Sequence, residues 1–147
     1  MKVSNIAVTA VIVITALASC KKEKMIAPVA IHKNYEGQWK NVIPPSAANS
    51  LDFINLTINL VAGETGTVDS KYISTAHVYP QTNLSWNKIA GDSVVITLNL
   101  PAYPADTWEL RGIANDSSTA IISNCYYIPN NALSSKSNMG TIILKKQ

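Results

Sequence analysis

Cysteine and histidine are scarce in this 147-residue chain, which contains two of each: Cys20, Cys125, His32 and His77. Two cysteines are too few for the disulfide framework that holds many small secreted domains together. The spacings H-x-H, C-x-x-C and H-E-x-x-H are lacking as well. We therefore expect neither a disulfide framework nor a metal site.

Charge is also scarce, with 14% charged residues and a formal net charge of +3. So weak a charge, without a basic stripe interleaved with aromatic residues, argues against nucleic acid as a partner. No nucleophile-elbow G-x-S-x-G occurs. Asp92, Asp106 and Asp116 fall in predicted turns, where aspartate usually bonds nearby backbone. Cys125 has no histidine near it in sequence, which favours an inert buried thiol over a nucleophile. We expect a protein that is not an enzyme and carries no cofactor.

Helical periodicity is lacking after residue 35, whereas apolar and polar residues alternate in many segments. The clearest case is segment 51–61, where Ile54, Leu56, Ile58 and Leu60 point one way and polar residues the other. The alternation predicts eight strands, at 36–42, 51–61, 66–75, 84–89, 93–100, 107–113, 119–128 and 141–145. Because no helix is long enough for a parallel crossover, we expect an all-β fold: an antiparallel up-and-down meander that closes into a small barrel.

The connections between these strands fall into two groups. Those at 62–65, 90–92 and 115–118 are short and contain the glycine, asparagine or aspartate of tight hairpin turns. Those at 43–50, 76–83, 101–106 and 129–139 are longer or rich in proline. Alternate connections of a meander share one end of the barrel. The sequence therefore predicts a closed end with tight turns and an elaborate end with long loops, where function usually lies.

The N-terminus has the layout of a secretory signal peptide, with Lys2 ahead of an apolar run at 6–17. That run is too short to span a hydrocarbon core, which needs about 20 apolar residues. Two alternatives stay open. The peptide could be cleaved elsewhere, leaving Cys20 as a plain thiol, or the run could form a cytosolic helix, although it has no polar face.

Leu17-Ala18-Ser19-Cys20 resembles the lipobox of bacterial lipoproteins. The resemblance implies that residues 1–19 are removed, that Cys20 is lipidated, and that 20–34 tether a domain of residues 35–147 to a membrane. The lysine-rich tether, with Lys21 after the cysteine, resembles lipoproteins of Bacteroidota, which implies the cell envelope and the outer membrane, on its periplasmic or surface face. The tether lysines either rest near anionic head groups or are simply solvated.

Gly37-Gln38-Trp39, followed by eight predicted strands, resembles the start of the lipocalin-like domains of bacterial lipoproteins. The resemblance implies that Trp39 plugs the closed base of the barrel beneath a cationic side chain of the last strand. Here Lys145 or Lys146 stands in place of the usual arginine, no second Thr-Asp-Tyr motif is present, and the chain is shorter than classical members.

The aromatic residues are the candidate ligand-binding groups. Trp86, Trp108 and Tyr126 share the face assigned inward, and Tyr79 and Tyr103 lie in long loops. An eight-strand bore holds either side chains alone or one small ligand. Two hypotheses follow: a binding module for a small apolar or amphipathic ligand, and a filled barrel whose loops bind an envelope protein or glycan.

Overall fold

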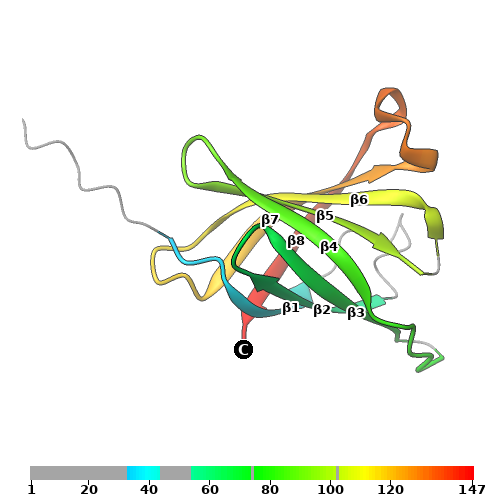
Figure 1. The fold of residues 1–147 in the computed structure, drawn as a ribbon, viewed down its shortest axis with the longest axis horizontal. Helices are drawn as coiled ribbons and strands as arrows, with labels where there is room; N and C mark the ends of the chain where they lie inside the picture. The colour runs from blue at the N-terminus through cyan, green and yellow to red at the C-terminus, as the bar shows by residue number, and fades with distance from the viewer. Residues whose placement is uncertain (1–32, 44–53, 74, 102) are drawn as a thin grey trace, which may run out of the picture. The chain divides into compact units, whose positions relative to one another are not determined.

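A computed structural model describes residues 33–43, 54–73, 75–101 and 103–147. Its elements are, in chain order, β1 (Gly37–Ile43), β2 (Ile54–Val61), β3 (Thr65–Tyr72), β4 (Thr82–Ile89), β5 (Ser93–Leu100), β6 (Tyr103–Ala114), β7 (Ala120–Ile128), the 3-10 turns η2 (Pro129–Asn131) and η3 (Leu133–Ser135), and β8 (Ser137–Lys146). Each strand pairs antiparallel with the next, and β8 pairs with β1, so that the sheet closes into a barrel (Figure 1). The predicted eight-strand meander is confirmed.

Two strands begin four residues earlier than predicted, β6 at Tyr103 instead of 107 and β8 at Ser137 instead of 141. Both early segments lie beyond a shift in register. Leu98 pairs with Trp108 but Leu100 pairs with Tyr103, and a second shift separates Cys125 from Tyr126 along β7. Such bulges break the period-two pattern while pairing continues.

The core fills the barrel interior. On β2, Ile54, Leu56, Ile58 and Leu60 are buried, and the residues between them are not, as the alternation predicted. Val94, Ile96, Leu98 and Leu100 on β5 and Trp108 and Leu110 on β6 are buried as well, although Val95 between the first two is also buried. One inward face therefore runs around all eight strands.

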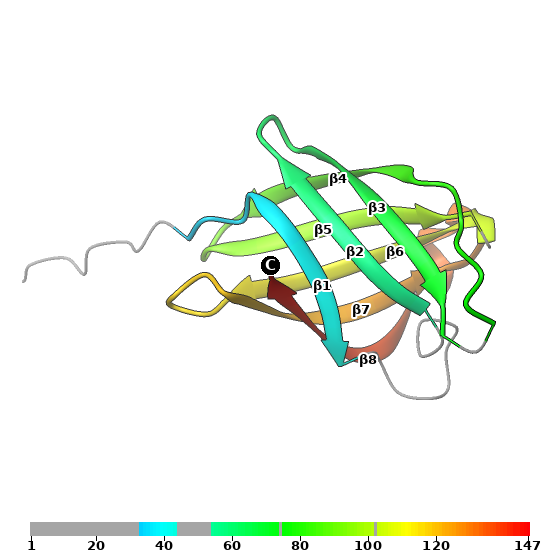
Figure 2. The same cartoon turned by 90° about the horizontal axis from the view of Figure 1, so that it is seen from below.

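The short turns gather at one end of the barrel, which Figure 2 shows on the side where the described chain begins. The phenol of Tyr35 donates to the carbonyl of Asp92 in the β4–β5 turn and accepts from the Ala114 amide at the end of β6, at 3.3 Å. The last residue, Gln147, donates its amide to the carbonyl of Gln38 at 3.0 Å. We call this the turn end, and the opposite end the loop end.

Trp39 is fully buried at the turn end. Its indole nitrogen donates to the Tyr35 carbonyl at 2.8 Å, and Lys146 Nζ lies 5.2 Å from the ring centroid. Of the two lysines considered, Lys146 is thus the one over the tryptophan. Gly37 adopts a φ of +118°, and a Cβ there would lie 3.1 Å from Lys146 Cε, so glycine suits both the backbone and the close packing.

The predicted signal peptide and Cys20 lie outside the described residues, as do His32 and the prolines at 44 and 45. The last two tether residues are described. Lys33 donates to the Ala114 carbonyl at 2.7 Å, and the Asn34 amide donates to Ser118 Oγ at 3.2 Å. Among the residues that the structure describes, no helix is long and apolar enough to cross a membrane.

Candidate functional site

The loop end carries a ring of inward side chains that are only partly buried: Tyr72, Tyr103, Tyr127 and Met139. We call this ring the mouth. Tyr72 ends β3, Tyr103 begins β6, Tyr127 lies near the end of β7, and Met139 lies near the start of β8. The mouth therefore draws one side chain from each of four strands, and it packs on the buried core beneath.

Two of these phenols meet across the barrel. The hydroxyl oxygens of Tyr72 and Tyr103 lie 2.9 Å apart, although β3 and β6 are separated by β4 and β5 in the sheet. We call this contact the phenol bridge. The hydrogen bond with Tyr103, followed by burial, raises the pKa of Tyr72 above its ordinary value, because removing the proton places a charge where the bridge needs a neutral group.

A carboxylate holds the third phenol. Tyr127 donates to Asp106 Oδ2 at 2.8 Å, and the Asn130 amide of η2 donates to Asp106 Oδ1 at 3.0 Å. The hydrogen bond to Asp106, followed by burial, raises the pKa of Tyr127. Asp106 thus does more than bond its own turn: it fixes the mouth phenol and the 3-10 turn after β7.

Beneath the mouth, the interior contains polar atoms without partners. Trp108 is 1% exposed and Ser70 2%, and neither Trp108 Nε1 nor Ser70 Oγ has a hydrogen-bond partner within the described part of the chain. Ser123, fully buried on β7 opposite Gly112 and so nearer the turn end, is the third residue with such an atom. The Trp108 ring packs on Tyr127, with centroids 4.8 Å apart. A buried donor without a partner costs about 1–3 kcal/mol, so the interior is not an ordinary apolar core.

The rim of the mouth continues onto the long loops. Tyr79 packs 5.5 Å from the Tyr72 ring, and His77 packs edge-on 4.6 Å from Tyr79. Three large apolar side chains at this end stand in solvent: Ile73 is 54% exposed, Val78 64% and Leu133 73%. The loop end therefore combines a ring of partly buried phenols with exposed apolar side chains on the loops around it.

The structure brings three of the five candidate ligand residues together. Trp108 and Tyr103 lie at the mouth, and Tyr79 lies on its rim. Trp86 is inward as predicted but lies at the turn end, 6.4 Å from Tyr35, with its indole nitrogen donating to the carbonyls of Val61 and Thr65 at 3.0 and 2.9 Å. Trp86 is therefore not part of the mouth.

The inward assignment of Tyr126 is wrong. Cys125 is inward and fully buried, so Tyr126 faces outward, where Lys136 Nζ lies 4.3 Å from its ring centroid. The neighbouring Tyr127 is the inward residue. The sequence misled because β7 places Ile122 outside and Ser123 inside, opposite to the usual apolar-in, polar-out order.

Four residues of the site were missed from sequence: Tyr72, Asp106, Tyr127 and Met139. Tyr72 could have been found, because it alternates with the inward positions Val68 and Ser70 in its predicted strand. Asp106 and Met139 carry no such signal, since both lie in the segments affected by the bulges.

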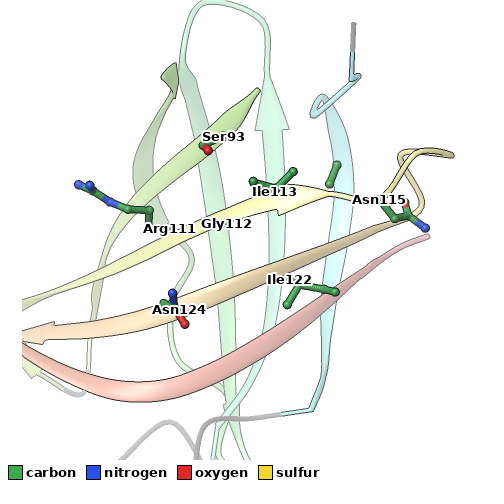
Figure 3. A pocket seen from close by; sticks show the side chains of 8 residues that line it. Ser93, Arg111, Gly112, Ile113, Asn115, Ile122 and Asn124 are labelled. Carbon is green, nitrogen blue, oxygen red and sulfur yellow. The ribbon is translucent and has the colours of Figure 1, made fainter. Parts of the chain in front are cut away.

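The outer surface of the barrel carries grooves, of which two are the larger among the described residues. One of about 510 Å³ lies over β5, β6 and β7, with Ile113 and Ile122 side by side between Arg111, Asn124 and Asn115 (Figure 3). Arg111 is turned towards Glu109, with its Nη2 3.2 Å from the carboxylate. The other, of about 380 Å³, lies over β1–β3 between Lys40, Lys71 and Val78. Of the three residues whose buried polar atoms lack a partner, Ser70 also borders the second groove. Trp108 and Ser123 border neither of these two grooves.

The remaining reactive side chains offer little chemistry. Cys125 is fully buried, and burial raises the pKa of its thiol to about 12, so it is protonated and sealed at neutral pH. His77 is exposed on the rim. Across the described ranges, no group of three or more His, Cys, Asp and Glu side chains is placed to hold a metal ion.

No known protein family matches this chain, and no curated protein or solved structure is significantly similar to it. What the chain does must therefore be argued from its own residues.

Proposed function

We propose that this chain is a cell-envelope lipoprotein whose barrel binds a small apolar or amphipathic ligand at the loop end. One observation carries the ligand-binding part: the partly buried mouth of Tyr72, Tyr103, Tyr127 and Met139 stands over the unpaired indole of Trp108. Small-molecule sites typically pair apolar and aromatic walls with a few convergent polar groups. The arrangement supplies both.

The anchoring part rests on the sequence, from the apolar run at 6–17 to Cys20. Two or more acyl chains on Cys20 would hold the protein stably at a membrane, whereas one chain binds only marginally. The lipocalin-like assignment is supported by Gly37 and Trp39 at the turn end and by Lys146 over the tryptophan ring. The lysine-rich tether, with Lys21 after the cysteine, supports the outer membrane of a Bacteroidota-type envelope as the host membrane.

A second function is favoured by a specific observation. Ile73, Val78 and Leu133 present exposed apolar surface on the loops around the mouth. Exposed apolar patches often mark protein contacts. In this alternative the barrel is structural and its loops bind an envelope protein or glycan.

Native mass spectrometry of the full-length protein, purified from its own host cells, separates the two functions. A retained molecule of a few hundred daltons, released by Trp108→Ala but not by Tyr126→Phe, supports the ligand-binding module. Copurification of a stoichiometric protein with no small molecule supports the alternative. For the anchor, wild-type protein should incorporate radiolabelled palmitate and Cys20→Ala should not; equal labelling of the two would overturn the lipoprotein proposal.

A further inference from the structure

The unpaired atoms beneath the mouth have a defined relation to the phenol bridge. Ser70 precedes Tyr72 by two residues on β3, so it occupies the next inward position below it. Trp108 pairs with Leu98 and Tyr103 pairs with Leu100, so Trp108 lies one inward position below Tyr103. Each half of the bridge therefore stands over one unpaired polar atom.

These groups are proton donors. The indole nitrogen of Trp108 can only donate, and the hydroxyl of Ser70 can donate as well as accept. In the phenol bridge one hydroxyl donates to the other, which leaves the second phenol proton for another acceptor. Both unpaired atoms beneath the bridge can therefore donate a hydrogen bond to a single acceptor atom.

The surroundings are unsuited to an anion. Asp106 lies at the mouth, and its carboxylate already accepts hydrogen bonds from Tyr127 and Asn130. Lys88 and Lys146 lie over Tyr35 and Trp39 at the turn end. Lys136, at the loop end, lies over the outward ring of Tyr126 and is already paired with Glu109 at 2.7 Å. Because Lys136 is already paired on the outer face, an anionic ligand beneath the mouth would be buried near the Asp106 carboxylate without a free partner among these cations, which costs far more than burying a neutral acceptor.

We propose that the ligand carries an uncharged oxygen acceptor, such as a ketone, ester or quinone carbonyl, and enters with that oxygen first. The oxygen accepts from Trp108 Nε1 and Ser70 Oγ, and the apolar remainder lies at the mouth against Met139 and the rim. This inference rests on the proposed ligand-binding function and names its ligand class. Since both atoms are sealed in the structure, the ligand must part Tyr72 from Tyr103 to reach them.

The rim gives independent support for this direction of entry. Ile73 and Leu133 stand in solvent at the loop end, where the apolar part of an oxygen-first ligand would emerge. A ligand entering tail first would instead set its polar end among these side chains and leave the buried donors unpaired.

Equilibrium dialysis of the full-length protein in detergent micelles tests the proposal, with protein-free micelles as the blank. The probes are 2-nonanone, nonane and nonanoate, which have the same carbon count and differ in the acceptor and its charge. The proteins are wild type, Trp108→Phe, Ser70→Ala and Ser123→Ala. Ser123 is the matched control, because its hydroxyl is also buried and unpaired but lies opposite Gly112, towards the turn end.

Wild type should bind 2-nonanone about a hundredfold more tightly than nonane, as expected for two hydrogen bonds that contribute about tenfold each, and nonanoate more weakly than the ketone. Trp108→Phe and Ser70→Ala should each lose about tenfold for the ketone and nothing for nonane, while Ser123→Ala changes neither. Thermal unfolding checks that each variant folds; if Trp108→Phe does not, Ser70→Ala against Ser123→Ala decides.

Equal affinity of wild type for ketone and alkane would overturn the oxygen-first inference and leave the ligand-binding function standing. Ketone affinity unchanged in Ser70→Ala and Trp108→Phe would overturn it too, and would assign the buried donors to internal water. Failure of wild type to bind any of the three probes would instead count against the binding function itself.

Discussion

The hydroxyl oxygens of Tyr72 and Tyr103 lie 2.9 Å apart and join β3 to β6 across the loop end of the barrel. These strands are not neighbours in the sheet, so the contact links two walls that no backbone hydrogen bond connects. Because both tyrosines belong to the mouth, their hydrogen bond holds the two sides of the mouth together. Changes at either tyrosine should therefore be felt in stability and in access to the interior together.

Removing the bridge should cost little in stability. Tyr72→Phe and Tyr103→Phe keep the rings and delete the hydroxyls, and a net hydrogen bond contributes about 0.5–1.5 kcal/mol. A double-mutant cycle on denaturant midpoints should show coupling of this size between the two, because both substitutions remove the same contact. Tyr126→Phe is the control, since that ring faces outward beneath Lys136. Additive effects at 72 and 103 would mean that the bridge does not form in solution.

Stability should fall in the alkaline range. The pKa values of Tyr72 and Tyr127 are raised in the folded state, through the bonds to Tyr103 and Asp106 respectively. A raised pKa stabilises the fold fully below the unfolded value of about 10 and less and less as pH rises through the folded value. Urea midpoints should therefore drop above about pH 10 in wild type. The drop should be shallower in Tyr72→Phe/Tyr127→Phe; an identical pH profile for both proteins would contradict the assignment.

The fold could be predicted because the strands obey a period of two. β5 matches the predicted segment 93–100 from end to end, since Val94, Ile96, Leu98 and Leu100 all face inward and the extra residues of the shift at Leu98–Leu100 lie on β6. The starts of β6 and β8 could not be predicted, because the chain there continues to pair across bulges that shift which residues face inward.

The site was harder to predict than the fold, for two physical reasons. The contact of Tyr72 with Tyr103 joins residues 31 positions apart through side-chain reach across the bore, which no local pattern encodes. On β7 the buried Ser123 and the exposed Ile122 reverse the usual apolar-in, polar-out order. The alternation therefore predicted Tyr126 as the inward residue, whereas Tyr127 is the one that faces inward. The reversal is itself informative, because polar groups are seldom left unpaired in a core without a function.

Gly112→Ala should destabilise the barrel by about 1–3 kcal/mol, the usual cost of overpacking. A Cβ at Gly112 would lie 2.7 Å from Ser123 Cα and would also clash with the Ile122 carbonyl oxygen, so β7 would have to shift. Urea unfolding measures the loss. The control is Asn124→Ala, at an exposed position of β7, which should change stability by no more than about 0.5 kcal/mol. Equal losses would mean that β6 and β7 are not so closely packed.

Trp39→Ala should cost about 3–5 kcal/mol, as for other large buried aromatic residues. The ring is fully buried at the turn end, and its indole bond to the Tyr35 carbonyl would be lost as well. Asn59→Ala, at an exposed position of β2, should stay within about 0.5 kcal/mol. If the two denaturation midpoints fell equally, Trp39 would not be the plug of the barrel.

The last prediction concerns the direction in which the mouth faces. The described chain begins at Lys33, which bonds Ala114 at the turn end, so a lipid anchor at Cys20 would pull on that end. The loop end, with the mouth, should then point away from the bilayer and meet ligand from the surrounding compartment. Ser117→Cys and Ser134→Cys place one thiol at each end, at exposed positions. Cys125 will not compete for label, because it is sealed in the core with a raised pKa.

With the lipidated protein on phosphatidylcholine vesicles that contain a nitroxide lipid, a fluorophore at position 117 should be quenched more than one at 134. The tether of residues 20–33 reaches at most about 45 Å when extended. A stretched tether should weaken the quenching at both positions, but position 117 should remain the more strongly quenched of the two. Equal quenching would mean that the barrel turns freely on its tether. Stronger quenching at 134 would place the mouth on the bilayer, and a membrane-borne ligand would then be the one to seek.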